Sequence, residues 1–366
     1  MHSDSNTNKL IRTFFPETLI DTGSRDLPKD ADEQAIQLDK NELPYEISSG
    51  AKEQIIDKLK NTNWNRYPSP YYPGIESQLA NYAGVEKSNI VLGIGAAQLI
   101  TMLFNLLARK NLIITYPSFS LFEYLCRTYG INFQRWKLDE NFEYNAGNLP
   151  PLRKETVIIL ASPNNPTGTL IRKTLLESLL KENPETFFIV DEVYSEFSNC
   201  TNKELLKSHS NLILIRSFSK AFGLAGVRAG YLLCSTQIAK QLRKLVLPFV
   251  LNHYSEITLK TILTSKTITF DILDKINKVS SERDRIYKEL KNLETTTDFQ
   301  VFPSHSNFLL LKFLDETKFS RYLSRLEEQH IRVMNLSHLE ELKNSIRLTI
   351  GKPEENDKAL KCLKGC

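Results

Sequence analysis

The sequence predicts an α/β fold with a large domain built on a mostly parallel sheet and a smaller α+β domain. Between residues 89 and 233, short apolar runs typical of buried strands alternate with longer stretches typical of helices. Glycines and small polar or charged residues follow directly after several of these strands. From about residue 235 long helical stretches dominate, and only two strand-like pieces follow, at 307–312 and 345–350.

The order of these patterns predicts the domain boundaries. Residues 1–37 are expected to form an arm with little regular structure, because prolines and a glycine interrupt any period. A large domain over 38–250 and a small domain over 251–366, joined by part of the N-terminal segment, are expected to follow. A short strand and turn are predicted over 38–45. Helices are predicted over 49–60, 99–107, 173–181 and 270–293. Further strands are predicted over 89–92, 112–115, 132–138, 156–160, 187–190, 212–215 and 230–233.

Composition narrows the class of protein. The 366 residues carry a formal net charge of only +4 and contain no block of basic residues, so nucleic-acid binding has no electrostatic support. We expect no membrane span, no signal peptide and no metal site. The five cysteines are scattered and odd in number, which suits reduced thiols in a cytoplasm: Cys126, Cys200, Cys234, Cys362 and Cys366.

The stretch 217–228 holds the strongest chemical signal in the chain. Lys220 follows the apolar run 212–215, and a lysine at the end of a buried strand is shifted toward its neutral, nucleophilic form. The hydroxyls of Ser217 and Ser219 and the guanidinium of Arg228 can hold a phosphate beside it. A nucleophilic lysine next to a phosphate site suggests pyridoxal phosphate (PLP) bound as a Schiff base. A solvated surface lysine is the competing interpretation of this stretch alone.

Several other polar groups also fall at predicted strand ends. The turn Gly93-Ile94-Gly95 opens a helix after one strand, and backbone N–H groups at such a helix start can cradle a phosphate. Asn165 and Asp191 follow two further strands. In open parallel sheets the carboxyl ends of the strands build the ligand site. We therefore expect these groups to meet Lys220 at one edge of the sheet.

With these motifs in view, the chain after the arm resembles the fold-type I, PLP-dependent aminotransferases of class I/II, and most closely their histidinol-phosphate aminotransferase subfamily. The resemblance rests on 41–45 (Asn-Glu-Leu-Pro-Tyr), 66–68 (Arg-Tyr-Pro), 164–168 (Asn-Asn-Pro-Thr-Gly) and 219–226 (Ser-Lys-Ala-Phe-Gly-Leu-Ala-Gly). It implies the PLP-transferase fold type I, with a seven-stranded sheet flanked by helices. It also implies transfer of an amino group from an amino acid or related primary amine to a 2-oxo acid.

The resemblance implies roles around the cofactor ring. Lys220 would form the Schiff base and move the proton during transfer. Asp191 would pair with the pyridine nitrogen and keep it protonated. Asn165 and Tyr194 would donate hydrogen bonds to the 3′ oxygen, and Phe119 would stack on the ring.

The same resemblance implies a phosphate site that two subunits share. The phosphate would be held by the backbone N–H groups of Ala96 and Ala97 and by the side chains of Ser217, Ser219 and Arg228. Tyr67 of a partner subunit would add a further hydrogen bond. A site completed across an interface implies a homodimer.

The substrate site follows the family less closely. Arg347 matches the arginine that binds the substrate carboxylate or phosphate, with Asn165 beside it. Met334 stands where the subfamily usually has an arginine. Arg332, two residues earlier, would lie on the same strand face and is the candidate to replace it. We therefore expect an amino donor other than histidinol phosphate, for example a non-phosphorylated amine or amino acid.

Two other functions compete with this interpretation. The first is a PLP-dependent decarboxylase that resembles threonine-phosphate decarboxylase, because residues 248–252 faintly resemble that family. The second is a non-catalytic PLP-binding domain of a regulator. The chain shows no helix-turn-helix extension or basic arm that would serve such a regulator.

Overall fold

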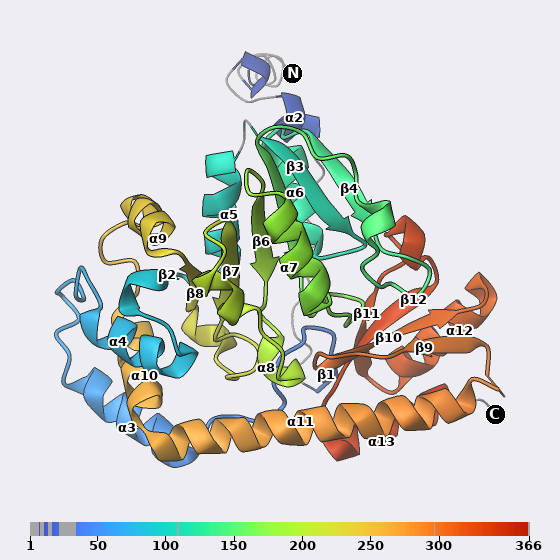
Figure 1. Cartoon of the computed structure of the whole chain (residues 1–366). Helices are drawn as coiled ribbons and strands as arrows, with labels where there is room; N and C mark the ends of the chain where they lie inside the picture. Colours follow the sequence, from blue (N-terminus) through green and yellow to red (C-terminus); the bar gives the residue numbers. More distant parts are fainter. Residues whose placement is uncertain are drawn as a thin grey trace.

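Two sheets of different size organise the chain. The computed structural model describes residues 7, 11–13, 17–21, 34–107, 110–295 and 297–364. Most of the expected N-terminal arm lies outside these residues, apart from short pieces such as α2 (Glu17–Asp21). A seven-stranded sheet forms the centre of the molecule, and a five-stranded sheet lies to its right in Figure 1.

The larger sheet contains every strand predicted between residues 89 and 233. Its members are β2 (Ile90–Gly93), β3 (Asn111–Tyr116), β4 (Phe133–Lys137), β5 (Thr156–Ala161), β6 (Phe187–Asp191), β7 (Leu212–Ser217) and β8 (Gly230–Cys234). They lie in the order β2-β8-β7-β6-β5-β3-β4. Only β8 runs antiparallel to its neighbours, and the other pairs are parallel. The prediction of a mostly parallel, seven-stranded sheet is confirmed.

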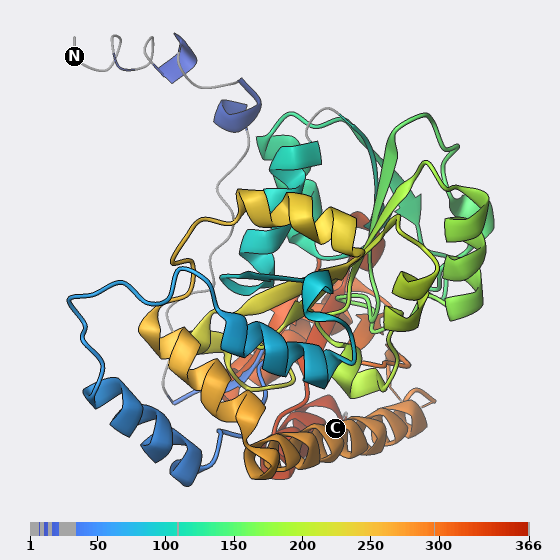
Figure 2. The same cartoon turned by 60° about the vertical axis from the view of Figure 1, so that its left-hand side comes forward.

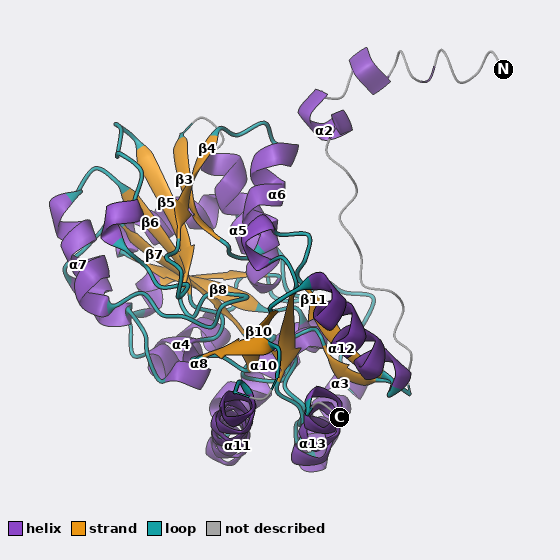
Figure 3. Ribbon diagram, turned by 90° about the vertical axis from the view of Figure 1, so that its right-hand side faces the viewer, coloured by secondary structure: helices purple, strands orange, loops and turns teal. Residues whose placement is uncertain are grey.

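Both faces of this sheet are buried, which explains why its strands are apolar throughout. Val190 and Leu214 belong to one hydrophobic cluster, whereas Ile189 and Ile213 belong to another. Successive side chains of a strand point to opposite faces, so each strand serves both clusters. Helices cover the two faces (Figures 1 and 3): α5 (Gly95–Leu107), α6 (Ser120–Thr128), α7 (Lys173–Glu182) and α9 (Thr236–Leu242).

The smaller sheet draws strands from both ends of the chain. It contains β1 (Ile36–Leu38), β9 (Phe299–Phe302), β10 (Phe308–Phe313), β11 (Ile331–Asn335) and β12 (Ser345–Thr349), in the order β1-β11-β12-β10-β9. Only β10 and β12 were predicted as strands outright. The strand expected from residue 38 starts two residues earlier, because β1 is defined by its parallel pairing with β11 rather than by a local pattern. Thus a segment close to the N-terminus completes the C-terminal sheet.

The remaining helices pack beside and beneath the sheets. They are α3 (Ser49–Lys60), α4 (Pro73–Ala83), α8 (Ser195–Ser198), α10 (His253–Thr264), α11 (Lys266–Leu293), α12 (Glu316–Glu328) and α13 (Pro353–Leu363). The long helix α11 runs beneath both sheets with α13 beside it (Figures 1 and 3). It starts before the predicted residue 270 because Ser265 caps it, accepting a hydrogen bond from the Ile268 N–H. Within the described part of the chain, no helix has both the length and the apolar character to cross a membrane.

Candidate active site

The predicted site residues leave the larger sheet at neighbouring strand ends. Asp191 is the last residue of β6, and Lys220 follows three residues after β7. Asn165 lies in the loop after β5, and Gly95 opens α5 after β2. The β5–β6 and β6–β7 pairs are parallel, so these strands present their carboxyl ends at one edge. Arg347 of β12 meets this edge from the smaller sheet, as its contact with Asn165 demonstrates.

The amine of Lys220 lies among groups that favour its neutral form. Its Nζ donates a 2.7 Å hydrogen bond to the carbonyl of Lys40, just after β1. Burial, together with the positive charges of Arg347 and Arg228, lowers the pKa of Lys220 to about 8. A far larger fraction of the amine is therefore unprotonated near neutral pH than for an exposed lysine. This is the state in which a lysine attacks an aldehyde.

Asp191 is a buried carboxyl group with little local compensation. Its side chain is 4% exposed, and its Oδ1 accepts a 3.2 Å hydrogen bond from the Val193 N–H. Burial raises the pKa of Asp191 to about 7, and the charge of Lys220 opposes that shift only as a lesser cause. A cationic N–H group bound against this carboxyl would favour its ionised form.

Arg347 and Asn165 form a direct polar contact between a strand of the smaller sheet and a loop of the larger one. Arg347 Nη1 donates to Asn165 Oδ1 at 2.6 Å, and its Nη2 donates to the carbonyl of Asp39. Both side chains are buried, and burial lowers the pKa of the arginine. Its Nε has no hydrogen-bond partner among the described residues. The guanidinium therefore retains a donor for an anionic ligand.

Tyr194 is held by residues that the sequence analysis did not assign to the site. Asn41 Nδ2 donates to the Tyr194 hydroxyl at 2.9 Å, and Thr349 Oγ1 donates to Asn41 Oδ1 at 2.9 Å. Asn307 Nδ2 in turn donates to the carbonyl of Asn41 at 3.1 Å. Burial raises the pKa of Tyr194, which keeps the hydroxyl protonated. The signal in the sequence for this contact is the motif at 41–45, which contains Asn41.

The start of α5 and the loop after β7 form a cradle of donors. Gly95 has φ +74°, and a Cβ built on it would lie 3.0 Å from Arg228 Nη2. Arg228 Nη1 donates to Ser219 Oγ at 3.4 Å, and the Ser219 N–H donates to Ser217 Oγ at 3.0 Å. The guanidinium therefore lies over the helix start, beside two hydroxyl groups.

Ala96 and Ala97 contribute backbone groups to the same cradle. Both residues lie in the first turn of α5, where helix N–H groups have no partner within the helix. A Cβ on Gly230 of β8 would lie 2.8 Å from the Ala96 nitrogen, so glycine at that position permits the close approach. A helix N-terminus beside an arginine favours a phosphate group.

Three other predicted residues lie around this cluster. Phe119 is half-buried at the start of α6, and its ring packs edge-on against Phe122 with centroids 5.7 Å apart. Tyr67 lies in the loop between α3 and α4, where it is 80% exposed and stacks on Phe249. Arg332 Nη2 lies 3.6 Å from Asp39 Oδ2, so its charge is directed to that carboxylate.

The residues present fit PLP. A buried, poorly compensated carboxyl group at Asp191 matches a protonated pyridine nitrogen. A lysine with a lowered pKa matches the aldehyde, and the cradle of hydroxyls, guanidinium and helix N-terminus matches the phosphate. These three kinds of group occur together at one end of the sheet, as the three reactive parts of the cofactor require.

Comparison with known proteins agrees with this chemistry. The family model for aminotransferase class I and II matches residues 33–363. A histidinol-phosphate aminotransferase of Pyrococcus furiosus is 34% identical over 90% of this chain and 91% of its own length. A second one, from Archaeoglobus fulgidus, is 33% identical over 91% and 93%.

Solved structures give the same result. The histidinol-phosphate aminotransferase from Clostridium acetobutylicum matches with a TM-score of 0.81 and 26% identity, covering 90% of this chain and 98% of that one. A second one, from Sinorhizobium meliloti in complex with PLP, matches with a TM-score of 0.81 and 21% identity over 94% and 95%. The fold is that of these enzymes, and the chain belongs to the class I and II aminotransferases, as a PLP-dependent transaminase.

Proposed function

We propose that this transaminase moves an amino group from an amino acid or related primary amine to a 2-oxo acid, in the manner of the histidinol-phosphate aminotransferases it is similar to. The single observation that carries the proposal is the setting of Lys220. Its amine has a lowered pKa and is close enough to the buried Asp191 and to Arg347, the proposed anion-binding residue, for both charges to act on it. That arrangement serves a reaction in which a lysine gives up and takes back a proton near a bound carboxylate.

Each part of the cofactor has a proposed partner in this chain. Asp191 holds the pyridine nitrogen protonated, and Asn165 and Tyr194 donate to the 3′ oxygen, while Phe119 covers the ring face. The phosphate is held by the backbone N–H groups of Ala96 and Ala97 and the side chains of Ser217, Ser219 and Arg228. The support is the shared location of these groups at strand ends, with the distances given above.

Lys220 is proposed to carry the proton. When bound, PLP withdraws electrons from the bond that the donor Cα makes with its proton. With the cofactor bound, Lys220 Nζ would be the base that takes the proton from the donor Cα and holds it for return. The carbonyl of Lys40 accepts a 2.7 Å hydrogen bond from this amine and so restrains its position. Burial lowers the pKa of the amine, which raises the fraction that is uncharged and able to accept a proton near neutral pH.

We propose that the donor presents one anionic group to Arg347 and an uncharged part to Met334. The two residues are cross-strand partners in β11 and β12, so their side chains project from the same sheet face. Arg347 keeps a free donor at Nε within the described part of the chain. Arg332 shares this face but lies beside Asp39, which partly neutralises it. A thioether next to the anion site favours a non-phosphorylated amino acid or amine over histidinol phosphate.

A homodimer with a shared site is also part of the proposal. The loop between α3 and α4, blue in Figure 2, extends from the body of the molecule. It carries Trp64, Tyr67 and Tyr71, each at least 77% exposed, and Tyr67 stacks on Phe249. Such aromatic side chains are typical of an interface core. Light scattering would give about twice 42.0 kDa for the dimer, and a mass of 42.0 kDa would contradict it.

The compartment and the domain boundaries are also part of the proposal. A cytoplasmic location is supported by the free cysteines of the described chain, Cys126, Cys200, Cys234 and Cys362. The division into a large domain over 38–250 and a small domain over 251–366 is supported by the two sheets, which share no strand.

A half-reaction screen tests the proposed function. The holoenzyme is mixed with histidinol phosphate and, separately, with a panel of amino acids, without any acceptor. A true donor converts the absorbance of bound pyridoxal phosphate to that of pyridoxamine phosphate. Conversion by a neutral amino acid supports the proposal for the donor, whereas fast conversion by histidinol phosphate alone would overturn it. No conversion by any donor, with release of CO₂ instead, would indicate a decarboxylase.

A further inference from the structure

A buried ion pair joins the residues that adjoin two proposed cofactor ligands. Glu192 follows Asp191, and Arg216 precedes Ser217. Arg216 Nη2 lies 2.7 Å from Glu192 Oε2, and the two side chains are 9% and 0% exposed. Arg216 and Ser217 are consecutive in β7, so the arginine points to the sheet face opposite the phosphate ligand. The pair therefore lies behind the proposed cofactor site rather than in it.

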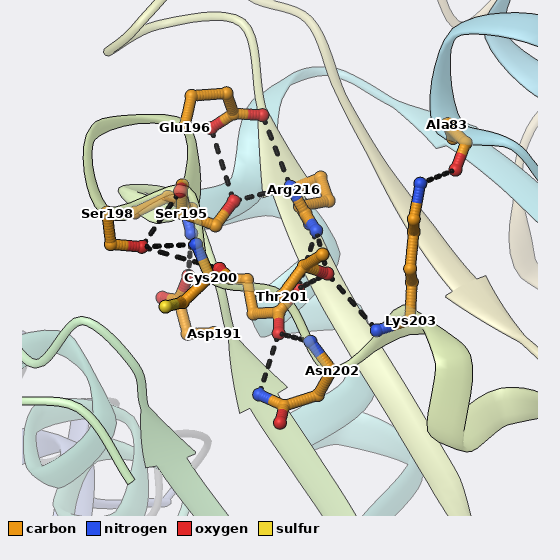
Figure 4. A network of polar contacts seen from close by, with 12 residues as sticks. Ala83, Asp191, Ser195, Glu196, Ser198, Cys200, Thr201, Asn202, Lys203 and Arg216 are labelled. Atoms are coloured by element: carbon orange, nitrogen blue, oxygen red, sulfur yellow. Dashed lines mark hydrogen bonds and ion pairs between the residues drawn. The ribbon is translucent and has the colours of Figure 1, made fainter. Parts of the chain in front are cut away.

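Both side chains make several hydrogen bonds, and only Arg216 Nε of the pair is buried without a partner among the described residues. Glu192 Oε1 accepts from the Asn202 backbone N–H at 2.6 Å and from Asn202 Nδ2 at 2.8 Å. Thr201 Oγ1 accepts from Arg216 Nη2 at 2.5 Å and donates to Glu192 Oε2 at 3.1 Å. Figure 4 shows Arg216 bridged to Ser195 and Thr201, with Asp191 close by. A network of this kind holds its members in one geometry.

Backbone hydrogen bonds connect this network to the proposed cofactor ligands. The Glu192 N–H donates to the carbonyl of Ile215 at 2.9 Å, which extends the β6–β7 pairing past Asp191. The ion pair thus joins the residue that follows β6 to the penultimate residue of β7 on the far face. PLP is rigid, so the distance between the groups that hold its ring nitrogen and its phosphate has to match the cofactor. A binding side chain has to be held within about 0.5 Å of its productive position by the groups behind it.

We propose that Glu192 and Arg216 are positioning residues that set the spacing between Asp191 and Ser217, and so determine how tightly PLP binds. This inference rests on the proposed roles of Asp191 and Ser217. Neither Glu192 nor Arg216 touches the cofactor. Their effect passes through the β6–β7 pairing and shows in cofactor affinity and in the properties of the bound cofactor.

The chain offers a matched control in Glu196. This second carboxylate contacts the same arginine, with its Oε1 3.2 Å from Arg216 Nη1. It belongs to α8 and adjoins neither strand end. Burial raises the pKa of Glu196, so the neutral amide is a mild replacement there. Glu192→Gln and Glu196→Gln each replace one carboxyl group that contacts Arg216 with an amide, but only Glu192→Gln alters the link between the strand ends.

The test compares PLP binding by the two variants. PLP is removed from the purified holoenzymes, and the dissociation constant is measured by absorbance titration. The pH midpoint of the bound-cofactor absorbance is recorded, together with the thermal unfolding midpoint of each apo protein. Glu192→Gln is expected to weaken PLP binding about tenfold. Losses of this size are typical when a group that orients a binding side chain is removed. Its absorbance midpoint is expected to rise, because a displaced Asp191 holds the ring nitrogen less well.

Glu196→Gln is expected to bind PLP within about twofold of the wild type, which is the scatter expected of a substitution outside the orienting link. Equal PLP affinity in the two variants, whatever their stability, would overturn the inference. If Glu192→Gln fails to fold, Arg216→Lys is tested in its place. A lysine keeps the positive charge but lacks the planar guanidinium that can bind two partners at once. Wild-type affinity in folded Arg216→Lys would contradict the inference. A wild-type protein without bound PLP would instead contradict the proposed function.

Discussion

Arg347 of the five-stranded sheet and Asn165 of the loop after β5 are joined by a 2.6 Å hydrogen bond that spans the two sheets. The guanidinium is buried and approaches the Lys220 amine closely enough to lower its pKa. One arginine thus connects the proposed substrate-anion site with the proposed catalytic amine. A substrate anion that binds Arg347 would also alter the field at Lys220.

Arg347→Ala is expected to raise KM for both donor and acceptor by about 10- to 100-fold. This is the loss of affinity expected when a hydrogen bond to a charged group is removed. The reason is that both substrates would present an anionic group to the same guanidinium. Initial rates at varied substrate concentration measure the effect. The absorbance of bound PLP serves as the control and should persist. An unchanged KM for both substrates would remove Arg347 from the substrate site.

The rate at which the apo protein captures PLP is expected to rise with pH and to level off above about pH 8, because the neutral Lys220 amine is the reactive form. Stopped-flow absorbance across a pH series measures this rate. Arg347→Ala should move the midpoint upward, since the charge of Arg347 is one of the causes that lower the pKa of Lys220. A rate that keeps rising toward pH 10.5, the ordinary lysine value, would show that Lys220 is not perturbed.

Asp191→Asn is expected to stabilise the apo protein above pH 7. The pKa of Asp191 rises on folding from 3.8 to about 7. The protonated carboxyl group therefore contributes fully to the free energy of unfolding below pH 3.8, and this contribution is lost as pH rises through 7. The gain is on the order of a few kcal/mol at pH 8 and is absent near pH 3.8. Urea unfolding of both apo proteins at the two pH values measures it. Asp191→Asn should also weaken PLP binding, and equal stability of the two proteins at pH 8 would contradict the burial argument.

Met334→Arg is expected to raise kcat/KM for histidinol phosphate by about tenfold, since it adds a second guanidinium beside Arg347. The preferred neutral donor should lose efficiency, because the apolar contact is replaced by a charge. Met334→Leu is the control, with similar volume and no charge, and should behave as the wild type does. If Met334→Arg leaves the ratio of the two efficiencies unchanged, residue 334 does not determine the donor.

The sequence predicted the parts of the site that lie in local patterns. Lys220, Asp191 and Asn165 each follow a strand that is apolar on both faces, and the common edge follows from parallel pairing. Asn41 could not be assigned in the same way, because its contact with Tyr194 spans 153 positions and depends on how β1 joins the smaller sheet. Arg332 lies on the expected face, but its approach to Asp39 is likewise a tertiary contact.

The buried charges were the least predictable feature. A lone Glu192 or Arg216 in a sequence is expected at the surface, because burying an unpaired charge is costly. Each is buried here because the other compensates it, and that compensation appears only once β6 and β7 are paired. Strand β9 was missed, and β1 was predicted two residues too late, for a related reason, since three or four residues carry no reliable period.

Chemical labelling of the cofactor lysine tests the central claim most directly. The purified holoenzyme is reduced with borohydride, which fixes the bond between PLP and its lysine, and is then digested and mapped by mass spectrometry. The pyridoxyl group is expected on the peptide that contains Lys220, and Lys220→Ala should carry no label and lose turnover. A label on another lysine, or multiple turnover by Lys220→Ala, would contradict the account.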